Sequence, residues 1–229
     1  MTVQFDRIED GMAQSSAPLG LVHISRRGGL YRNGFKRIVD IAIIVLASPF
    51  ILPVIALLSI CVAIDGGKPF YRSTRVGKNG HDFGMLKLRT MVPNASAQLE
   101  AHLAGDDAAR VEWDTTQKLK NDPRITRFGR IMRKTSLDEL PQLWNVLVGD
   151  MSLVGPRPML PEQRELYPGL AYYALRPGIT GPWQVSDRNN SKFSKRAEHD
   201  RDYDASLTFT GDLMLILRTI GVVFRGTGY

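Results

Sequence analysis

The chain has 229 residues, of which 43% are hydrophobic and 23% are charged, and its formal net charge is +7. This composition argues against intrinsically disordered, collagen-like and multi-span membrane proteins, and the length favours one compact domain. A single cysteine, Cys61, excludes an intramolecular disulfide and a multi-cysteine zinc site. The basic excess predicts an anionic partner, which is nucleic acid, a phosphorylated small molecule or an acidic membrane surface.

Residues 1–33 contain mostly small and polar side chains without a periodic apolar pattern, so we expect a flexible N-terminal tail without a secretory signal. The stretch 41–64 is different, because its 24 residues carry no charge. A straight helix of this length would be about 36 Å long, enough to cross a hydrocarbon core of about 30 Å.

Two features of this apolar stretch argue against a simple crossing. The Ser48-Pro49 pair near its middle predicts a bend, because proline removes a backbone donor and clashes with the preceding turn. Basic residues on both flanks predict that both ends lie on the cytoplasmic side. These residues are Arg26, Arg27, Arg32, Lys36 and Arg37 before the stretch, and Lys68, Arg72, Arg75 and Lys78 after it. We therefore expect residues 34–66 to form a re-entrant helical hairpin; a proline-kinked span and a buried core helix are the alternatives.

Polar groups within this stretch need partners. The hydroxyls of Ser48 and Ser59 are candidates for the backbone groups that Pro49 leaves free. Asp40 is expected to pair with Lys36 or Arg37 at the membrane interface.

A β-hairpin is predicted over residues 69–88, because two alternating runs meet at Lys78-Asn79-Gly80, which contains the strongest short hairpin signal. Residues 94–120 have a helical but polar pattern and predict an exposed insertion, to which we assign no chemistry.

Two further helices are predicted from their apolar patterns. The segment 124–134 places its apolar residues on one face and its basic residues on the rest. This pattern predicts a helix lying on anionic lipid headgroups or, alternatively, one that covers a core and turns a basic face to solvent. Residues 212–224 predict a strongly apolar helix that packs under the domain or lies in the membrane interface.

The chain has no P-loop, no GxGxxG or GxSxG motif and no His/Cys metal-ligand spacing. Its most distinctive segment is TSLDELPQ at 135–142. Ser136 followed by Glu139 fits a capping box, which predicts a helix that begins there and ends at Gly149. The first interpretation of Asp138 and Glu139 is therefore structural, because acidic residues are common in a first helical turn.

Basic residues around this pair favour a chemical role instead. Arg130, Arg133 and Lys134 precede it, and Arg157 follows in a Gly- and Pro-rich turn suited to aim a guanidinium at phosphate. The segment 176–184 adds another arginine beside an aromatic residue. Carboxylates among arginines are expected to stay ionised and can hold Mg²⁺ or attack phosphorus. Together these features predict a phosphoryl-transfer site at a membrane surface.

Several separated motifs, taken together, resemble the bacterial sugar transferases, the monotopic phosphoglycosyl transferases that start polysaccharide assembly on a polyprenyl phosphate. The resemblance covers residues 36–229. The motifs are the basic start at 36–40 with the Ser-Pro-broken apolar stretch, KLRTM at 87–91, DPRIT at 122–126, TSLDELPQ at 135–142, MSLVGPRP at 151–158 and RPGITG at 176–181.

The resemblance implies a mainly helical α/β protein, monotopic in the bacterial inner (cytoplasmic) membrane, with a re-entrant helical hairpin, a small β-hairpin and surface amphipathic helices. The catalytic domain, 67–229, would lie on the cytoplasmic face. The implied substrates are a UDP-sugar and undecaprenyl phosphate, and the implied cofactor is Mg²⁺. Inner-membrane lipid and a second copy of the chain are further expected partners; nucleic acid is not.

The resemblance also assigns roles to site residues. Asp138 would attack the sugar-linked phosphate, release UMP and pass galactose or glucose phosphate to undecaprenyl phosphate, the first step of exopolysaccharide assembly. Glu139, with Asp138, would hold Mg²⁺. Arg133 and Arg157 are the implied phosphate contacts. Lys87, Arg89, Arg176 and Gln184 are implied as phosphate, nucleotide or fold contacts.

Other interpretations stay open at this point. Asp138 could act as a general base or metal ligand in a direct transfer between two bound substrates. The chain could also be a non-catalytic membrane scaffold of polysaccharide synthesis. A membrane-anchored nucleic-acid-binding protein fits the charge, but the chain has no recognisable motif for it and the Asp-Glu pair would be unexplained.

Overall fold

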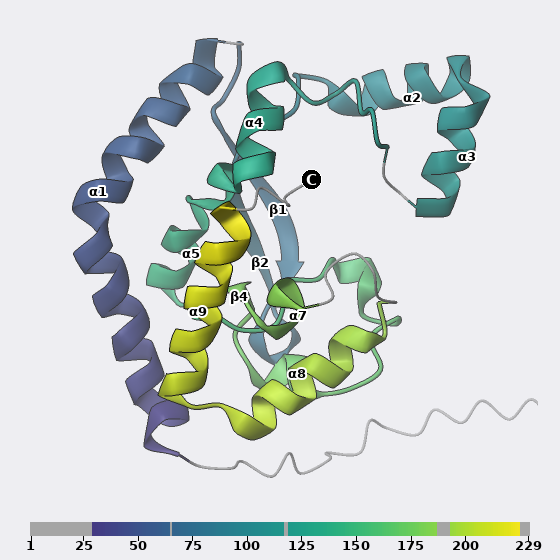
Figure 1. The fold of residues 1–229 in the computed structure, drawn as a ribbon. Helices are drawn as coiled ribbons and strands as arrows, with labels where there is room; N and C mark the ends of the chain where they lie inside the picture. The colour runs from purple at the N-terminus through teal and green to yellow at the C-terminus, as the bar shows by residue number, and fades with distance from the viewer. Residues whose placement is uncertain (1–28, 65, 117–118, 187–192, 225–229) are drawn as a thin grey trace, which may run out of the picture.

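The computed structural model describes residues 29–64, 66–116, 119–186 and 193–224. These residues form mostly helices with two small two-stranded sheets, which confirms the predicted mainly helical α/β class (Figure 1). The longer helices are α1 (Lys36–Ile64), α2 (Ala95–Gly105), α3 (Asp107–Thr116), α4 (Arg127–Thr135), α5 (Gln142–Val148), α8 (Lys195–Ser206) and α9 (Phe209–Phe224). The short helices and helical turns are η1 (Tyr31–Phe35), η2 (Lys78–Gly80), η3 (Leu137–Glu139), η4 (Pro161–Gln163), α6 (Ala171–Ala174) and α7 (Pro182–Val185). The strands are β1 (Phe70–Val76), β2 (Asp82–Leu88), β3 (Ser152–Val154) and β4 (Gly178–Thr180).

The predicted tail, 1–33, lies mostly outside the described residues, which begin at residue 29. Its last residues belong to the π-helical turn η1, which leads directly into α1. The helical part of the chain therefore begins within the segment that was predicted to be a tail.

Helix α1 is one helix that continues through Pro49 and Pro53, and its path bends near the middle (Figure 1). Pro49 removes the usual donor to the carbonyl of Val45, and the hydroxyl of Ser48 donates to that carbonyl at 2.8 Å. This bond confirms the role predicted for Ser48 and helps to explain why the helix does not break. The two arms of the expected re-entrant hairpin are thus one continuous, bent helix, and its position in a membrane stays a prediction.

Only a narrow stripe of α1 packs on the rest of the protein. Its buried residues are Asp40, Ile44, Leu58 and Val62. The segment Tyr31–Ile64 is long and apolar enough to cross a membrane, and only 6% of its most apolar stretch is buried. The alternative of a buried core helix is therefore wrong.

The partners predicted for Asp40 are also wrong. Its carboxylate accepts hydrogen bonds from the hydroxyl of Ser152 at 2.7 Å and from the backbone N–H of Leu153 at 3.3 Å. Lys36 pairs with a carboxylate on α9, and Arg37 donates to carbonyls of α5. Each of the two basic side chains thus meets an acceptor on another element, and Asp40 joins α1 to β3.

The β1–β2 hairpin confirms the sequence prediction, with Asn79 in the left-handed conformation at its turn. The register pairs Tyr71 with Lys87 and Arg75 with Phe83. Since paired residues lie on one face and side chains alternate along a strand, Arg75 and Lys87 share a face. The other sheet is the short parallel pair β3–β4.

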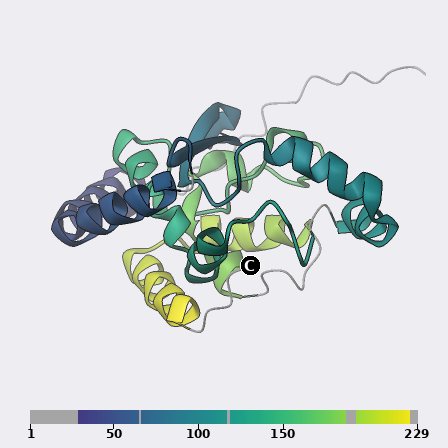
Figure 2. The ribbon, with the colours of Figure 1, turned by 90° about the horizontal axis from the view of Figure 1, so that it is seen from above.

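Helices α2 and α3 form an arm that projects from the body on the side away from α1 (Figures 1 and 2). The predicted polar insertion, 94–120, is thereby confirmed as helical and mainly exposed in its described part.

Helix α4 begins at Arg127, three residues later than predicted. Met132 on it is buried, and Phe128 packs against the same cluster, which includes Leu58 and Val62 of α1. The apolar face of α4 thus mainly covers a core, which is the second of its two predicted roles.

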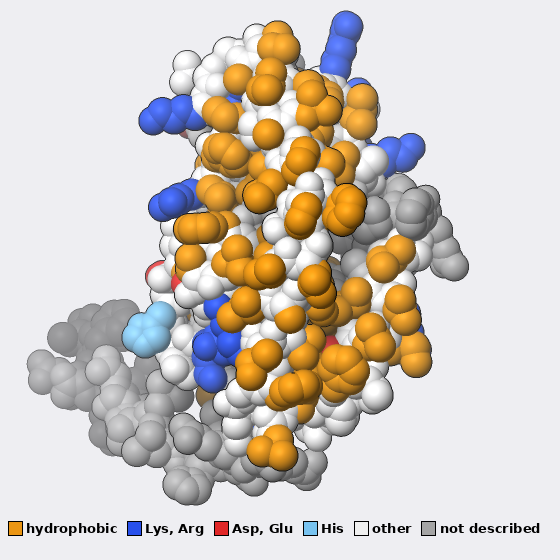
Figure 3. Space-filling view, turned by 90° about the vertical axis from the view of Figure 1, so that its left-hand side faces the viewer, with side chains coloured by type: hydrophobic (Ala, Val, Ile, Leu, Met, Phe, Trp, Pro, Cys, Tyr) orange, Lys and Arg blue, Asp and Glu red, His pale blue; other side chains and the backbone are white. Residues whose placement is uncertain are grey.

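Helix α9 turns apolar residues in two directions. Leu215 and Ile216 pack on a core cluster around Val154, while Leu213 and Leu217 are exposed. With the exposed apolar residues of α1 and α5, they make one side of the molecule apolar (Figure 3). This apolar side includes Ile38, Leu46, Phe50, Leu57 and Ile60 of α1, Trp144 and Val148 of α5, and Leu213, Met214, Leu217 and Ile220 of α9.

Candidate active site

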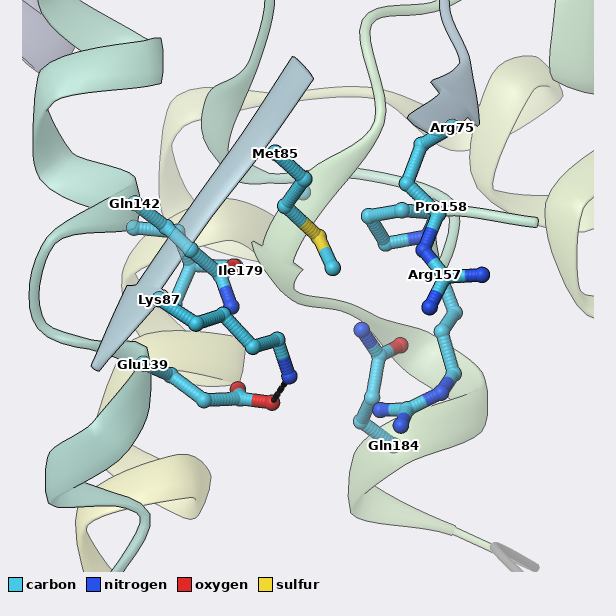
Figure 4. A pocket seen from close by; sticks show the side chains of 10 residues that line it. Arg75, Met85, Lys87, Glu139, Gln142, Arg157, Pro158, Ile179 and Gln184 are labelled. Atoms are coloured by element: carbon cyan, nitrogen blue, oxygen red, sulfur yellow. Dashed lines mark hydrogen bonds and ion pairs between the residues drawn. The ribbon is translucent and has the colours of Figure 1, made fainter. Parts of the chain in front are cut away.

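A cleft with an empty volume of about 300 Å³ lies where the β1–β2 hairpin, η3, α7 and the loop after β3 meet. Two walls face each other across it (Figure 4). The carboxylate wall consists of Lys87, Glu139 and Gln142, and the arginine wall consists of Arg75, Arg157 and Gln184. Met85, Pro158, Gly178 and Ile179 complete the lining.

The tight connection between α4 and α5 positions the carboxylate wall. Helix α4 ends at Thr135, its C-cap residue Ser136 has a left-handed φ of 56°, and the turn η3 follows at once. The side chain of Ser136 makes no cap hydrogen bond, and α5 begins only at Gln142. The predicted capping box is therefore wrong, although the helical turn η3 does begin directly after Ser136. Ser136 ends α4 and precedes η3 in a left-handed conformation, and its side chain caps neither segment. The predicted helix end at Gly149 is confirmed.

Two charged side chains meet on the carboxylate wall. The Nζ atom of Lys87 lies 2.7 Å from Oε1 of Glu139 (Figure 4). Asp138, the residue before Glu139, is only 7% exposed and lies beside this wall without lining the cleft.

The environment of Asp138 raises the pKa of its carboxyl to about 6. Burial is the main cause, and the charge of Glu139 adds to it, whereas Lys87 and Arg133 oppose it. Burial thus outweighs the cations, which is the reverse of the expected direction. The carboxylate is still mostly ionised at pH 7, but it is close to its titration range.

Arg133 supports this carboxylate from behind the cleft. Its Nε atom donates to Oγ1 of Thr90 at 2.8 Å. Burial lowers the pKa of the guanidinium, while the charges of Asp138 and Asp122 raise it. Arg133 therefore reaches Asp138 electrostatically and does not line the cleft.

Three guanidinium groups gather at the arginine wall, those of Arg75 and Arg157 in the lining and that of Arg196 next to Trp183. Arg157 is exposed, with its guanidinium carbon 5.7 Å from the centre of the Trp183 ring. Arg196 of α8 lies 4.2 Å from the same ring and 4.7 Å from that of Phe193. Burial first, and then the charge of Arg157, lower the pKa values of Arg75 and Arg196, the latter to about 10. These cations thus repel one another across the wall.

Close backbone contact between two loops holds Arg157 in place. A Cβ atom on Gly155 would lie 2.3 Å from the carbonyl oxygen of Arg176, and one on Gly178 would lie 2.1 Å from the backbone nitrogen of Gly155. No side chain fits there, so the motifs at 151–158 and 176–181 come together through glycine.

Four of the predicted site residues do not line the cleft: Asp138 and Arg133, described above, and Arg89 and Arg176. Arg89 donates to the carbonyls of Val62 at 2.9 Å and Lys68 at 3.0 Å, where α1 ends. Arg176 donates to the carbonyl of Gly149 at 2.8 Å, where α5 ends. Both are contacts that stabilise the fold, and Lys87, Glu139, Arg157 and Gln184 are the predicted residues that line the cleft.

The sequence interpretation gave no site role to Arg75 or Arg196. Arg75 had a usable signal, because the Asn79-Gly80 turn fixes a register that puts it on the same face as Lys87. Arg196 had none, since its place depends on how α8 packs beside α7.

Asp138 and Glu139 can be tested as ligands for Mg²⁺. Among the residues described, no group of three or more His, Cys, Asp or Glu side chains could hold a metal ion. Asp138 and Glu139 nevertheless lie close enough for one charge to raise the pKa of the other. Mg²⁺ commonly binds to one or two carboxylates together with substrate phosphates. The pair therefore fits an ion that a phosphorylated substrate helps to hold.

Comparison with known proteins gives consistent matches. The family model described as "Bacterial sugar transferase" matches residues 31–226. The chain is 40% identical over 203 residues to an exopolysaccharide production protein, ExoY, of Sinorhizobium fredii, covering 88% of each chain. It is 46% identical over 195 residues to a UDP-galactose-lipid carrier transferase of Erwinia amylovora, which is 84% of this chain and 41% of that protein. It is also 44% identical over 205 residues to an undecaprenyl-phosphate galactose phosphotransferase of Salmonella typhimurium, which is 89% of this chain and 42% of that protein. The chain thus spans about two fifths of the length of the last two relatives.

Proposed function

Because the chain belongs to the bacterial sugar transferase family, we propose that it transfers galactose or glucose phosphate from a UDP-sugar to undecaprenyl phosphate. This transfer would initiate the assembly of an exopolysaccharide repeat unit. The observation that carries the proposal is the meeting of Glu139 and Lys87 with Arg157 around one cleft, with Asp138 buried beside Glu139. The names of two relatives, which mention UDP-galactose and undecaprenyl phosphate, support the two substrate classes.

In the first step, a carboxylate oxygen of Asp138 attacks the phosphorus that carries the sugar. A phosphorus–oxygen bond to Asp138 forms as the bond to the bridging oxygen breaks, and UMP leaves with the electron pair. An anion attacking a diphosphate meets like-charge repulsion, which Lys87 and Arg157 reduce. The raised pKa of Asp138 still leaves the carboxylate mostly ionised at pH 7.

In the second step, a phosphate oxygen of undecaprenyl phosphate attacks the same phosphorus. The bond to Asp138 breaks, the carboxylate is restored, and the sugar diphosphate lipid is released. Arg133 stabilises the carboxylate as its charge returns, because it lies near Asp138 and is fixed by its hydrogen bond to Thr90.

Glu139 and Asp138 are the residues that would hold Mg²⁺ together with the oxygens of the diphosphate. The bound ion would neutralise part of the charge of the diphosphate and of the leaving UMP. Lys87 meanwhile keeps Glu139 oriented toward the cleft through their ion pair.

We place the apolar side of the molecule in the inner membrane, with the cleft on the cytoplasmic face. In this arrangement the bent helix α1 enters and leaves one leaflet, and α9 lies at the interface. The exposed apolar residues of α1, α5 and α9 support it. The substrates also favour it, because one is soluble and the other is held in lipid. Single cysteines at Asn33 and Lys78, in a chain without Cys61, test it: labelling from the same side of the membrane is expected, and labelling from opposite sides would contradict it.

Incubation of the detergent-purified protein with UDP-galactose or UDP-glucose, Mg²⁺ and undecaprenyl phosphate tests the function. We expect UMP from one donor, and no UMP above background without Mg²⁺ or with Asp138→Asn. A trapped phosphosugar adduct on Asp138 would distinguish the two-step reaction from direct transfer between two bound substrates. Transfer at the normal rate by Asp138→Asn would remove it as nucleophile, and absence of UMP from all UDP-sugars would favour a non-catalytic scaffold.

A further inference from the structure

The arginine wall of the cleft brings Arg75 and Arg157 together in front of Arg196, and the carboxyl groups that act on these cations, Glu162 on Arg75 and Asp200 on Arg196, do so through space. Among the described residues, none of Arg75, Arg157 and Arg196 forms an ion pair with a carboxylate. The Nε atoms of Arg75 and Arg196 are buried, and neither has a hydrogen-bond partner in the part of the chain that the structure describes. Burying guanidinium groups together without acceptors is unfavourable, so this arrangement is typical of a site that an anion completes.

Arg75 and Arg157 both line the cleft, and they come from different elements. Arg75 lies on β1, facing the same side of the hairpin as Lys87, and Arg157 lies in the loop after β3. Arg196 lies behind them, stacked on Trp183. The two guanidinium groups in the lining can therefore approach one ligand from two directions, while Arg196 adds positive charge without touching it.

The position of this wall relative to Asp138 matters for the chemistry. Asp138 precedes Glu139 in the chain and lies within electrostatic reach of Lys87 and Glu139. These two residues of the carboxylate wall face the arginine wall across the cleft (Figure 4), so Asp138 lies beside the wall opposite the arginines. In phosphoryl transfer the attacking and leaving oxygens lie roughly in line, on opposite sides of phosphorus. A phosphorus atom attacked by Asp138 would thus expel its leaving group toward the arginine wall.

The same geometry applies to the second displacement. The acceptor must displace Asp138 in line, so it attacks from the side that the first leaving group vacated. The leaving group and the acceptor both carry a phosphate monoester, and each would meet the same two guanidinium groups.

Resting on the function proposed above, we infer that Arg75 and Arg157 form one phosphate site opposite Asp138, used first by the phosphate of the departing UMP and then by that of the polyprenyl acceptor. Arg75 is the residue that this inference adds to the site. The inference predicts that the UDP-sugar, UMP and undecaprenyl phosphate compete for these two arginines, although the first two are soluble and the third lies in lipid.

The test compares UMP binding to the full chain in detergent with the KM for undecaprenyl phosphate. Arg75→Ala is expected to weaken both by about tenfold or more, which is the loss of one charge-assisted hydrogen-bond set. Arg75→Lys should recover part of the loss, because it keeps the charge and loses the planar fork. Arg72→Ala is the matched control, since Arg72 is an exposed arginine on the same strand; both values should stay within about twofold of the parent.

A UMP affinity within twofold of the parent in Arg75→Ala, at an unchanged melting temperature, would overturn the site. Weaker UMP binding with an unchanged KM for the acceptor would overturn its shared use. UMP binding needs no turnover, so it reports on Arg75 even if the parent protein releases no UMP from any UDP-sugar. A parent protein that releases no UMP from any UDP-sugar would contradict the proposed function, and not the inference about Arg75.

Discussion

Arginines have opposite surroundings in two regions of this molecule. At the ends of α1 and α5, the guanidinium groups of Arg37, Arg89 and Arg176 donate to backbone carbonyls. At the arginine wall of the cleft, Arg75 and Arg157 face a space, and burial and mutual repulsion act on the charge of Arg75. The chemistry of the side chain is the same in both regions.

The two groups of arginines differ in whether unpaired backbone carbonyls lie within their reach. The last carbonyls of a helix have no intrahelical donor, and a cation near that end is favourable. An arginine beside a helix end therefore stabilises the fold. Near the cleft, the backbone groups of β3 and β4 are already paired with each other, so the guanidinium groups remain available to a ligand. An arginine within a motif thus indicates a ligand only where no helix end lies within its reach.

Among the variants that test this contrast between the two groups of arginines, Arg157→Ala is expected to have the largest effect. Its side chain is exposed, so removing it should leave the melting temperature unchanged. Loss of its contacts to a diphosphate should lower kcat/KM for the UDP-sugar by about 10- to 100-fold, equivalent to about 1.5 to 3 kcal/mol. Steady-state UMP release and a thermal melt measure the two quantities. A lower melting temperature with normal kcat/KM would put Arg157 in the group of structural arginines.

The second prediction concerns Asp200, a buried carboxyl under the arginine wall. It accepts a hydrogen bond from the hydroxyl of Tyr167 at 2.8 Å, and burial raises its pKa to about 6. Because the folded state holds this proton more tightly than the unfolded state, the contribution of Asp200 to stability falls as pH rises from about 4 to about 6.

The variant Asp200→Asn should isolate this effect, because it stays neutral and keeps an oxygen for Tyr167. Relative to the parent, we expect it to gain roughly 2 kcal/mol of unfolding free energy between pH 4 and pH 7. Denaturant melts of both proteins at the two pH values give the difference. If the difference in unfolding free energy between Asp200→Asn and the parent is the same at both pH values, the charge of Arg196, which favours the ionised carboxylate, compensates the effect of burial on Asp200.

The smallest effect is expected from Arg89→Ala. It removes hydrogen bonds to the carbonyls of Val62 and Lys68 in a partly exposed side chain, so it should cost about 1 to 2 kcal/mol of stability. For a chain of this size, that lowers the melting temperature by about 2 to 8 °C. The KM for the UDP-sugar should stay the same at temperatures where the variant is folded. A raised KM with normal stability would return Arg89 to the ligand site.

Local patterns predicted the elements well. The helical conformation of 41–64, the hairpin turn at Asn79-Gly80 and the helix end at Gly149 all depend on neighbours in sequence, and all three are confirmed. The re-entrant hairpin expected for 34–66 stays a prediction. The capping box at Ser136 failed because the same residue pattern fits a helix start and a reversal between two helices, and only the packing of α4 and α5 selects between them.

The sequence motifs predicted some of the residues that line the cleft, but not the properties that depend on packing. Lys87, Glu139 and Arg157 line the cleft, as their motifs suggested. Arg89 and Arg176, from motifs of the same kind, lie at helix ends instead. The burial that raises the pKa of Asp138 is a property of the assembled structure and has no signature in the segment 135–142.

The glycine contact between the two cleft loops limits how this gene can vary. Each of Gly155 and Gly178 has backbone atoms within 2.3 Å of where a methyl group would be. In a library that carries every single substitution, we expect both positions to be recovered only as glycine after selection for polysaccharide. Substitutions of Arg157, which lines the cleft, should survive a screen for stability alone and be removed only by the selection for polysaccharide. Sequencing the two surviving populations would therefore separate the residues that shape the cleft from those that act in it.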